Sequence, residues 1–136
     1  MSSLLLRASV LFALVGMGLG LYMGVSQDLR LAPVHAHINL LGFVALFLAG
    51  VYYRLTPEAA ALRLAKLHVG VALCGACFFP VALALVTLGD SQEFGPVAGA
   101  GGAIVIAGMA LFAIVVFRTS GRAPSRSQVF NEQARK

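Results

Sequence analysis

Four long apolar runs occupy most of this chain and constrain its fold more than any other feature. They extend from about Ala8 to Val25, Leu31 to Tyr53, Leu67 to Leu88 and Gly95 to Phe117. Each run can cross a hydrocarbon core about 30 Å thick, which requires roughly 20 apolar residues in a helix. Only 11% of the 136 residues are charged, against about 25% in an ordinary globular domain. The composition excludes a soluble domain and predicts a membrane protein.

The runs predict helices and not the strands of a membrane barrel, because they lack the alternation of polar and apolar residues that barrel strands show. In lipid a backbone must satisfy its own hydrogen bonds, so an apolar run of this length is helical. Short connections predict an all-α, up-and-down four-helix bundle over residues 1–118. The first run is too long and too rich in glycine for a signal peptide and is expected to be a helix of the mature protein.

The basic residues indicate how the bundle is oriented. Nine of the ten Lys and Arg residues fall on one side of the predicted helices, and only Arg30 falls on the other. Cytoplasmic segments carry such an excess, so both termini are expected in the cytoplasm, in a bacterial-type inner membrane. The net charge of +5 then reflects topology and attraction to membrane lipid, and requires no nucleic acid. Residues 119–136 are polar and are expected to form a mobile cytoplasmic tail.

Three histidines are the most informative polar residues, since ionisable groups in a membrane span usually face a cavity, a partner or a ligand. His35 and His37 are about 200° apart around the second helix and are expected to face opposite sides. His68 opens the third run beside Lys66 and is expected to be hydrated at the membrane boundary. Helical rise puts His37 and His68 roughly 20 Å apart in depth, which excludes a metal ion shared by both within one chain.

Small residues are predicted at the depth of His37 on the other helices, including Gly20 in the first run and Gly101 in the fourth. Gly16, Gly20 and Gly24 also recur at every fourth position, a pattern that allows transmembrane helices to pack closely. Close packing is one explanation of these glycines. The other is a slot for a flat macrocycle such as haem, held by an axial histidine.

Cys74 and Cys77 form a CxxC motif on one face of the third run. In a soluble loop this spacing indicates zinc or redox chemistry. In the middle of a membrane helix two cysteines usually behave as small apolar residues. The four runs contain no acidic residue, which excludes paired carboxylates as a catalytic device within them.

The second run and its exit carry a longer motif. Residues 34–42 read VHAHINLLG and residues 50–58 read GVYYRLTPE. Together they resemble helix II of the haem-copper oxidase superfamily, with the nearest likeness in the catalytic subunit of nitric oxide reductase. In that helix a histidine followed by Asn-Leu-Leu is an axial ligand of low-spin haem b. The resemblance places His37 at the ligand position and gives His35 no ligand counterpart.

The resemblance covers residues 34–58, and the helices that carry the other ligands of those enzymes have no counterpart in this chain. It implies a short relative of the amino-terminal part of subunit I and not a complete oxidase or reductase. A second axial ligand could come from His37 of a second copy in a homodimer, or from Met23 or Met17. Alternatively, that position stays open for a gas. Arg30 could pair with a haem propionate or with Asp28.

We therefore expect a homodimeric membrane protein that binds haem b near the non-cytoplasmic side and transfers electrons or binds a diatomic gas, with a redox partner or an oxidase subunit as a possible neighbour. His37 is the expected iron ligand. The other expected cofactor-binding residues are His35, Arg30, Met23, Gly20 and Gly101. Two alternatives stay open. One is a non-catalytic scaffold or assembly subunit of a larger oxidase, in which His35 and His37 make interhelical hydrogen bonds. The other is copper handling by the two histidines and the two cysteines.

Overall fold

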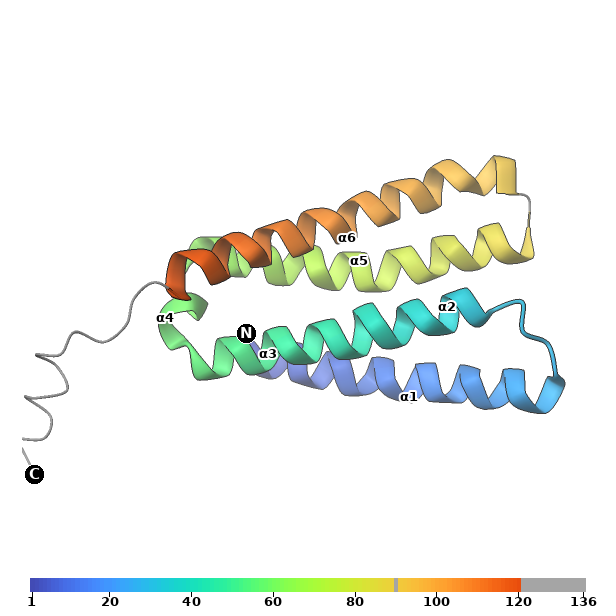
Figure 1. Ribbon diagram of the computed structural model, residues 1–136, viewed down its shortest axis with the longest axis horizontal. Helices are drawn as coiled ribbons and strands as arrows, with labels where there is room; N and C mark the ends of the chain where they lie inside the picture. Colours follow the sequence, from blue (N-terminus) through green and yellow to red (C-terminus); the bar gives the residue numbers. More distant parts are fainter. Residues whose placement is uncertain (90, 121–136) are drawn as a thin grey trace, which may run out of the picture.

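The computed structural model describes residues 1–89 and 91–120 (Figure 1). The elements in chain order are α1 (Ser2–Ser26), α2 (Ala32–His37), the π-helical segment η1 (Ile38–Ala45), α3 (Leu46–Leu55), α4 (Pro57–Ala60), α5 (Arg63–Leu88) and α6 (Ser91–Ser120). The segments α2, η1 and α3 form one continuous span, Ala32–Leu55, which we call the second span. All elements within the described ranges are helical. Four helices are long and apolar enough to cross a membrane. The predicted all-α bundle is therefore confirmed, with four helices that could span a membrane.

The four helices form two neighbouring pairs. Helix α1 lies along the second span, and α5 lies along α6 (Figure 1). The start of α1, the short helix α4 and the end of α6 lie at the same end of the bundle, which we call the α4 end (Figure 1). The connection between α1 and α2 lies at the opposite end, which we call the loop end. This is the up-and-down arrangement expected from short connections.

Three of the helices begin earlier than the hydropathy pattern predicted. Helix α1 begins at Ser2 and not Ala8, α5 at Arg63 and not Leu67, and α6 at Ser91 and not Gly95. Polar residues in the first turn of a membrane helix can lie in the headgroup region, so the helix extends beyond its apolar run. Helix α6 continues to Ser120, two residues beyond the predicted end of the bundle. The remainder of the predicted tail, residues 121–136, lies outside the described residues.

Local backbone features explain two of the connections. Gln27 ends α1 in the left-handed conformation, with φ 56° and ψ 21°, a common way to terminate a helix. Pro33 and Pro57 lie in the first turn of α2 and α4, where a proline lacks only an N–H that the helix does not use. These residues turn the chain between antiparallel helices.

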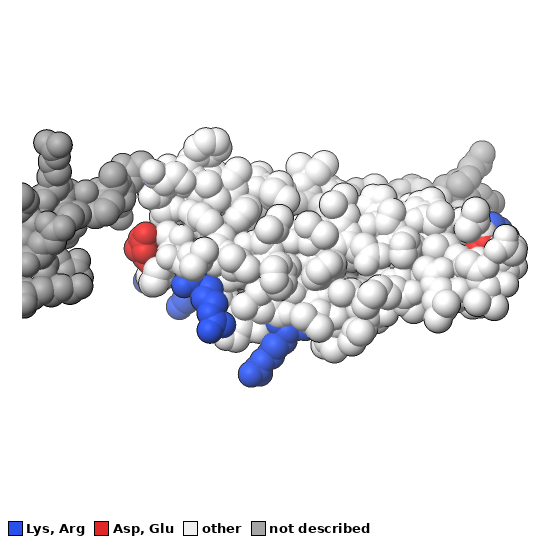
Figure 2. All heavy atoms as spheres, turned by 60° about the horizontal axis from the view of Figure 1, so that its bottom comes forward, with Lys and Arg blue, Asp and Glu red and all other residues white. Residues whose placement is uncertain are grey.

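The surface of the bundle is mostly apolar. Figure 2 shows Lys and Arg side chains gathered toward one end of the bundle and a long uncharged stretch between them and the few charged side chains at the other end. Large apolar side chains such as Leu11 and Leu21 of α1 and Ile106 of α6 are exposed, as expected where lipid covers the protein. The main cluster of buried residues lies toward the α4 end; its members are Leu5, Leu46, Ala49, Tyr53, Ala59, Ala65, Val69, Ala76 and Val115.

Two glycines of α1 allow the second span to approach closely. A Cβ atom on Gly16 would lie 2.5 Å from the side chain of Asn39, and one on Gly20 would lie 2.8 Å from Cε1 of His35. The close-packing explanation is thus confirmed for these two glycines, which act within one chain. Gly24, the third residue of the pattern, faces outward, since no heavy atom would lie within 4 Å of a Cβ atom at that position.

Candidate functional site

The side chain of His35 joins the second span to α1. Its Nδ1 atom lies 2.8 Å from the carbonyl O of Gly16. A carbonyl only accepts hydrogen bonds, so Nδ1 is the protonated nitrogen. Asn39 Nδ2 donates to the carbonyl O of His35 at 2.9 Å and lies 3.5 Å from the ring atom Nε2. The ring fills the space beside Gly20. His35 is therefore held between two helices.

His37 faces a different helix. Its ring packs edge-on against Phe79 of α5, with ring centroids 4.9 Å apart and an interplanar angle of 87°. The two histidines thus contact α1 and α5 respectively, which confirms the prediction that they face opposite sides. A separation of about 200° around the helix is the physical reason.

The tautomer of a neutral His37 ring follows from its hydrogen bond to Pro33. Nδ1 lies 2.7 Å from the carbonyl O of Pro33, one turn earlier in the same helix, and must donate to it. In a neutral imidazole Nε2 then carries the lone pair. Among the residues whose side chains the structure describes, none forms a hydrogen bond to Nε2 of His37. The half-buried ring can therefore offer one lone pair to a ligand.

The expected glycines lie against protein side chains. A Cβ atom on Gly101 would lie 3.1 Å from Cα of Phe79. Gly101 therefore lies at the level of His37, as the depth count predicted. The space beside Gly101 is filled by Phe78 and Phe79, as the space beside Gly20 is filled by His35. Within a single chain, neither glycine faces an open slot.

The two methionines considered as second ligands differ in their surroundings. Met23 is buried, with 5% of its surface exposed, whereas Met17 is 59% exposed on the outer side of α1. Met23 is therefore shielded from lipid by its own chain. Met17 is available only to lipid or to another molecule.

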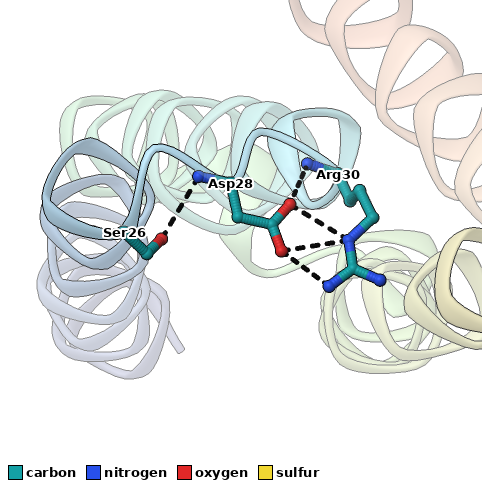
Figure 3. A network of polar contacts seen from close by, with 3 residues as sticks. All are labelled: Ser26, Asp28 and Arg30. Atoms are coloured by element: carbon teal, nitrogen blue, oxygen red, sulfur yellow. Dashed lines mark hydrogen bonds and ion pairs between the residues drawn. The ribbon is translucent and has the colours of Figure 1, made fainter.

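Arg30 pairs with Asp28 at the loop end (Figure 3). Its Nη2 atom lies 2.6 Å from Oδ2 of Asp28, and its Nε and backbone N each lie 3.0 Å from Oδ1. Asp28 N–H donates to Ser26 Oγ at 3.3 Å. Hydrogen bonds from Arg30 lower the pKa of Asp28 to about 2. Of the two partners expected for Arg30, the structure shows Asp28.

His68 is buried, and the prediction that it is hydrated was wrong. Only 4% of its surface is exposed. Tyr53 Oη lies 2.9 Å from Nδ1 of His68, and the ring of Phe112 stacks on the imidazole with centroids 5.0 Å apart. Because α5 begins at Arg63, His68 lies more than one turn inside the helix, opposite the end of the second span. Phe79 lies three turns further along α5, about 16 Å away, which keeps His37 and His68 apart.

A second polar contact at the α4 end was not predicted. Tyr52 Oη lies 2.5 Å from Oγ1 of Thr119, and Thr119 is 7% exposed. The contact joins the second span to α6. The adjacent tyrosines of the motif were the available signal, since a buried tyrosine hydroxyl usually finds a partner.

The cysteines do not join the histidines. Cys74 and Cys77 are free thiols exposed on the outer side of α5. In the part of the chain that the structure describes, no three His, Cys, Asp or Glu residues come close enough to hold a metal ion together. These residues therefore include no ligand cluster that would support the copper alternative.

Comparison with protein-family models, with curated proteins and with solved structures found no match to this chain.

Proposed function

We propose that this chain is a haem-binding membrane protein in which His37 is the axial ligand of the iron. The hydrogen bond from His37 Nδ1 to the Pro33 carbonyl O is the observation that carries this proposal. Histidines that bind metals usually donate their other ring N–H to a carbonyl or carboxylate, which fixes the tautomer and raises the basicity of the ligand nitrogen. His37 has this arrangement, and Phe79 limits rotation of its ring.

The same geometry favours His37 over His35. In the scaffold alternative both histidines make interhelical hydrogen bonds. Only His35 makes one, to Gly16 of α1, and its Nε2 lies near Asn39. The hydrogen bond of His37 stays within its own helix. His35 is therefore a packing residue. His37 keeps a lone pair on Nε2 that can bind a ligand.

One chain supplies one such ligand at this depth, because His68 lies at the α4 end, about 16 Å along α5 from the Phe79 contact of His37. We propose that a symmetric homodimer supplies the second ligand as His37 of the other copy, giving one haem b for two chains. Gly18 and Gly24 support close association, since both are exposed and no heavy atom lies within 4 Å of a Cβ built on either. Met23 and an open position for a diatomic gas are the other solutions.

Haem would supply one-electron chemistry or gas binding. The chain's own residues would hold and shield it: the Pro33 carbonyl orients His37, and Phe79 covers one edge of its ring. Arg30 holds Asp28 through Nε and Nη2, so it would offer Nη1 to a haem propionate. We propose electron transfer or gas binding in a bacterial-type inner membrane, and no complete oxidase or reductase activity.

Absorption spectroscopy tests the proposal. Protein purified in mild detergent from haem-replete cells should show a Soret band, with narrow α and β bands on reduction. The His37→Ala variant should lose haem or contain high-spin iron. The His68→Ala variant is the matched control and should keep the wild-type spectrum, because three turns of α5 separate His68 from Phe79, which contacts His37. A colourless but folded protein would support the scaffold alternative.

The two neighbouring histidines give a sharper test. The His35→Ala variant should keep part of its haem, since it loses a packing contact and not the ligand. Complete loss of haem in His35→Ala with retention in His37→Ala would show that the motif selects the wrong histidine. A haem content of one per two chains, with a dimer in light-scattering measurements, would support the symmetric arrangement.

A further inference from the structure

A cavity of about 350 Å³ lies between the second span and the α5–α6 pair. Its size falls in the range of roughly 300–1,000 Å³ that is usual for small-molecule sites. Among the residues that line it, His68 alone has a polar side chain. The cavity extends from His68 toward the middle of the bundle, where Leu41 and Val105 line it. It is separate from His37, which does not line it.

The cavity reaches the surface that faces lipid. Leu40, Leu48 and Met109 line it and are each more than half exposed. A molecule can therefore enter sideways from the bilayer without crossing the polar ends of the bundle. This route selects lipid-soluble ligands.

One nitrogen of His68 opens onto the cavity. Nδ1 is taken by the Tyr53 hydroxyl, and no hydrogen bond to Nε2 occurs among the described residues. Every fully buried side-chain nitrogen or oxygen in those residues has a hydrogen-bond partner, so a ring nitrogen without a partner is not fully buried. Nε2 must therefore retain some accessible surface, although only 4% of the whole residue is exposed. Because His68 lines the cavity, a ligand in the cavity could place a polar atom against Nε2.

The Tyr53–His68 pair can either donate or accept a hydrogen bond at Nε2. If the Tyr53 hydroxyl donates to Nδ1, Nε2 carries a proton and can donate to a carbonyl oxygen. If Nδ1 donates to the hydroxyl instead, Nε2 has a lone pair and can accept from an O–H group. A ligand that alternates between carbonyl and hydroxyl oxygens fits this property.

We propose that the cavity binds the ring of a lipid-soluble quinone or quinol, with one ring oxygen hydrogen-bonded to His68 Nε2. The apolar tail leaves past Leu48 or Met109 into the bilayer. Phe112, already stacked on His68, and the thioether of Met109 suit an aromatic ring. A saturated acyl chain would fill the same space but leave Nε2 without a partner, which is unfavourable in an apolar site. The inference does not depend on haem binding at His37.

Tyrosine fluorescence can test the proposal, because the chain has no tryptophan and quinones quench nearby tyrosines. The full-length protein in detergent micelles is titrated with decyl-benzoquinone, and with decylbenzene as a competitor that has the same tail but no ring oxygen. Free tyrosine amide in the same micelles gives the background. We expect saturable quenching at one quinone per chain, with decylbenzene competing only weakly.

Variants connect the binding to His68. The His68→Leu variant should raise the Kd by about threefold to tenfold, the effect of one lost hydrogen bond. The Ala45→Phe variant, which places a ring in the cavity, should abolish binding. The Ala103→Phe variant makes the same change on the exposed side of α6, away from the cavity, and should bind as wild type. Circular dichroism and gel filtration establish that each variant is folded.

Three results would overturn the proposal. The first is quenching that does not saturate, which would mean that quinone only partitions into the micelle. The second is decylbenzene competing as well as decyl-benzoquinone, which would identify a groove for lipid chains. The third is an unchanged Kd in a folded His68→Leu variant.

Discussion

Nδ1 of His35 lies 2.8 Å from the carbonyl O of Gly16, a residue 19 positions earlier in the chain. His37, two positions later, uses the same ring atom to bind a carbonyl of its own helix. The imidazole of His35 thus joins two helices, whereas the imidazole of His37 bonds within its own helix and keeps Nε2 free. This difference separates the structural histidine from the proposed ligand.

The His35 contact predicts a difference in stability between the two histidines. The His35→Leu variant should lose about 0.5–1.5 kcal/mol of unfolding free energy, because an interhelical hydrogen bond disappears. The His37→Leu variant should lose less, since its bond lies within one helix. Unfolding of cofactor-free protein in mixed micelles, followed by circular dichroism, measures both. Equal losses would contradict the structural role of His35.

The glycines of α1 predict a position-specific effect of alanine. Gly16→Ala should destabilise the bundle by about 1–3 kcal/mol, as overpacked sites do, because the new methyl group would meet the Asn39 side chain at 2.5 Å. Gly70→Ala in α5 is the control, with no heavy atom within 4 Å of a Cβ atom at that exposed position. It should be neutral or slightly stabilising, since alanine favours helix. The same unfolding assay compares the two, and similar effects would exclude close packing at Gly16.

The Asp28–Arg30 pair predicts a response to acid. Folding lowers the pKa of Asp28 from its ordinary 3.8 to about 2. The carboxyl is therefore more acidic in the folded state, and the contribution of the pair is present above about pH 4. It is lost as the pH falls toward 2. Carboxyl carbon NMR of labelled protein should show Asp28 titrating near pH 2 in wild type and at a higher pH in Arg30→Gln, where the backbone N–H of residue 30 is the remaining donor. An Asp28 pKa near 4 in both would show that the pair does not form.

The charge distribution predicts the orientation in the membrane. A periplasmic phosphatase fused after Lys136 should be inactive, because nine of the ten basic residues lie on the side of the termini. The same phosphatase inserted between Gln27 and Arg30 should be active. Activity of the C-terminal fusion, with none in the loop insertion, would invert the assignment.

The four helices could be predicted because run length and hydropathy alone decide whether a segment can cross lipid. Their starts could not, since Ser2 and Arg63 are polar residues that a membrane helix accommodates in the headgroup region. The divergence of His35 and His37 followed from helical geometry. The burial of His68 did not, because its partner Tyr53 lies in another helix beyond the α4 turn. Contacts between helices depend on how they rotate against one another, which hydropathy does not specify.

The π-helical segment η1 separates the His37 end of the second span from its Tyr53 end. Its hydrogen bonds join residue i to i+5, so each turn holds more residues than an α-helical turn. A one-residue deletion in this segment can be accommodated if the segment becomes α-helical. The residues on either side of it then keep their orientation toward the neighbouring helices. The same deletion in the middle of α5 would rotate all later residues by about 100°. The second span can therefore change length by one residue while it keeps both the His37–Phe79 and the Tyr53–His68 contacts.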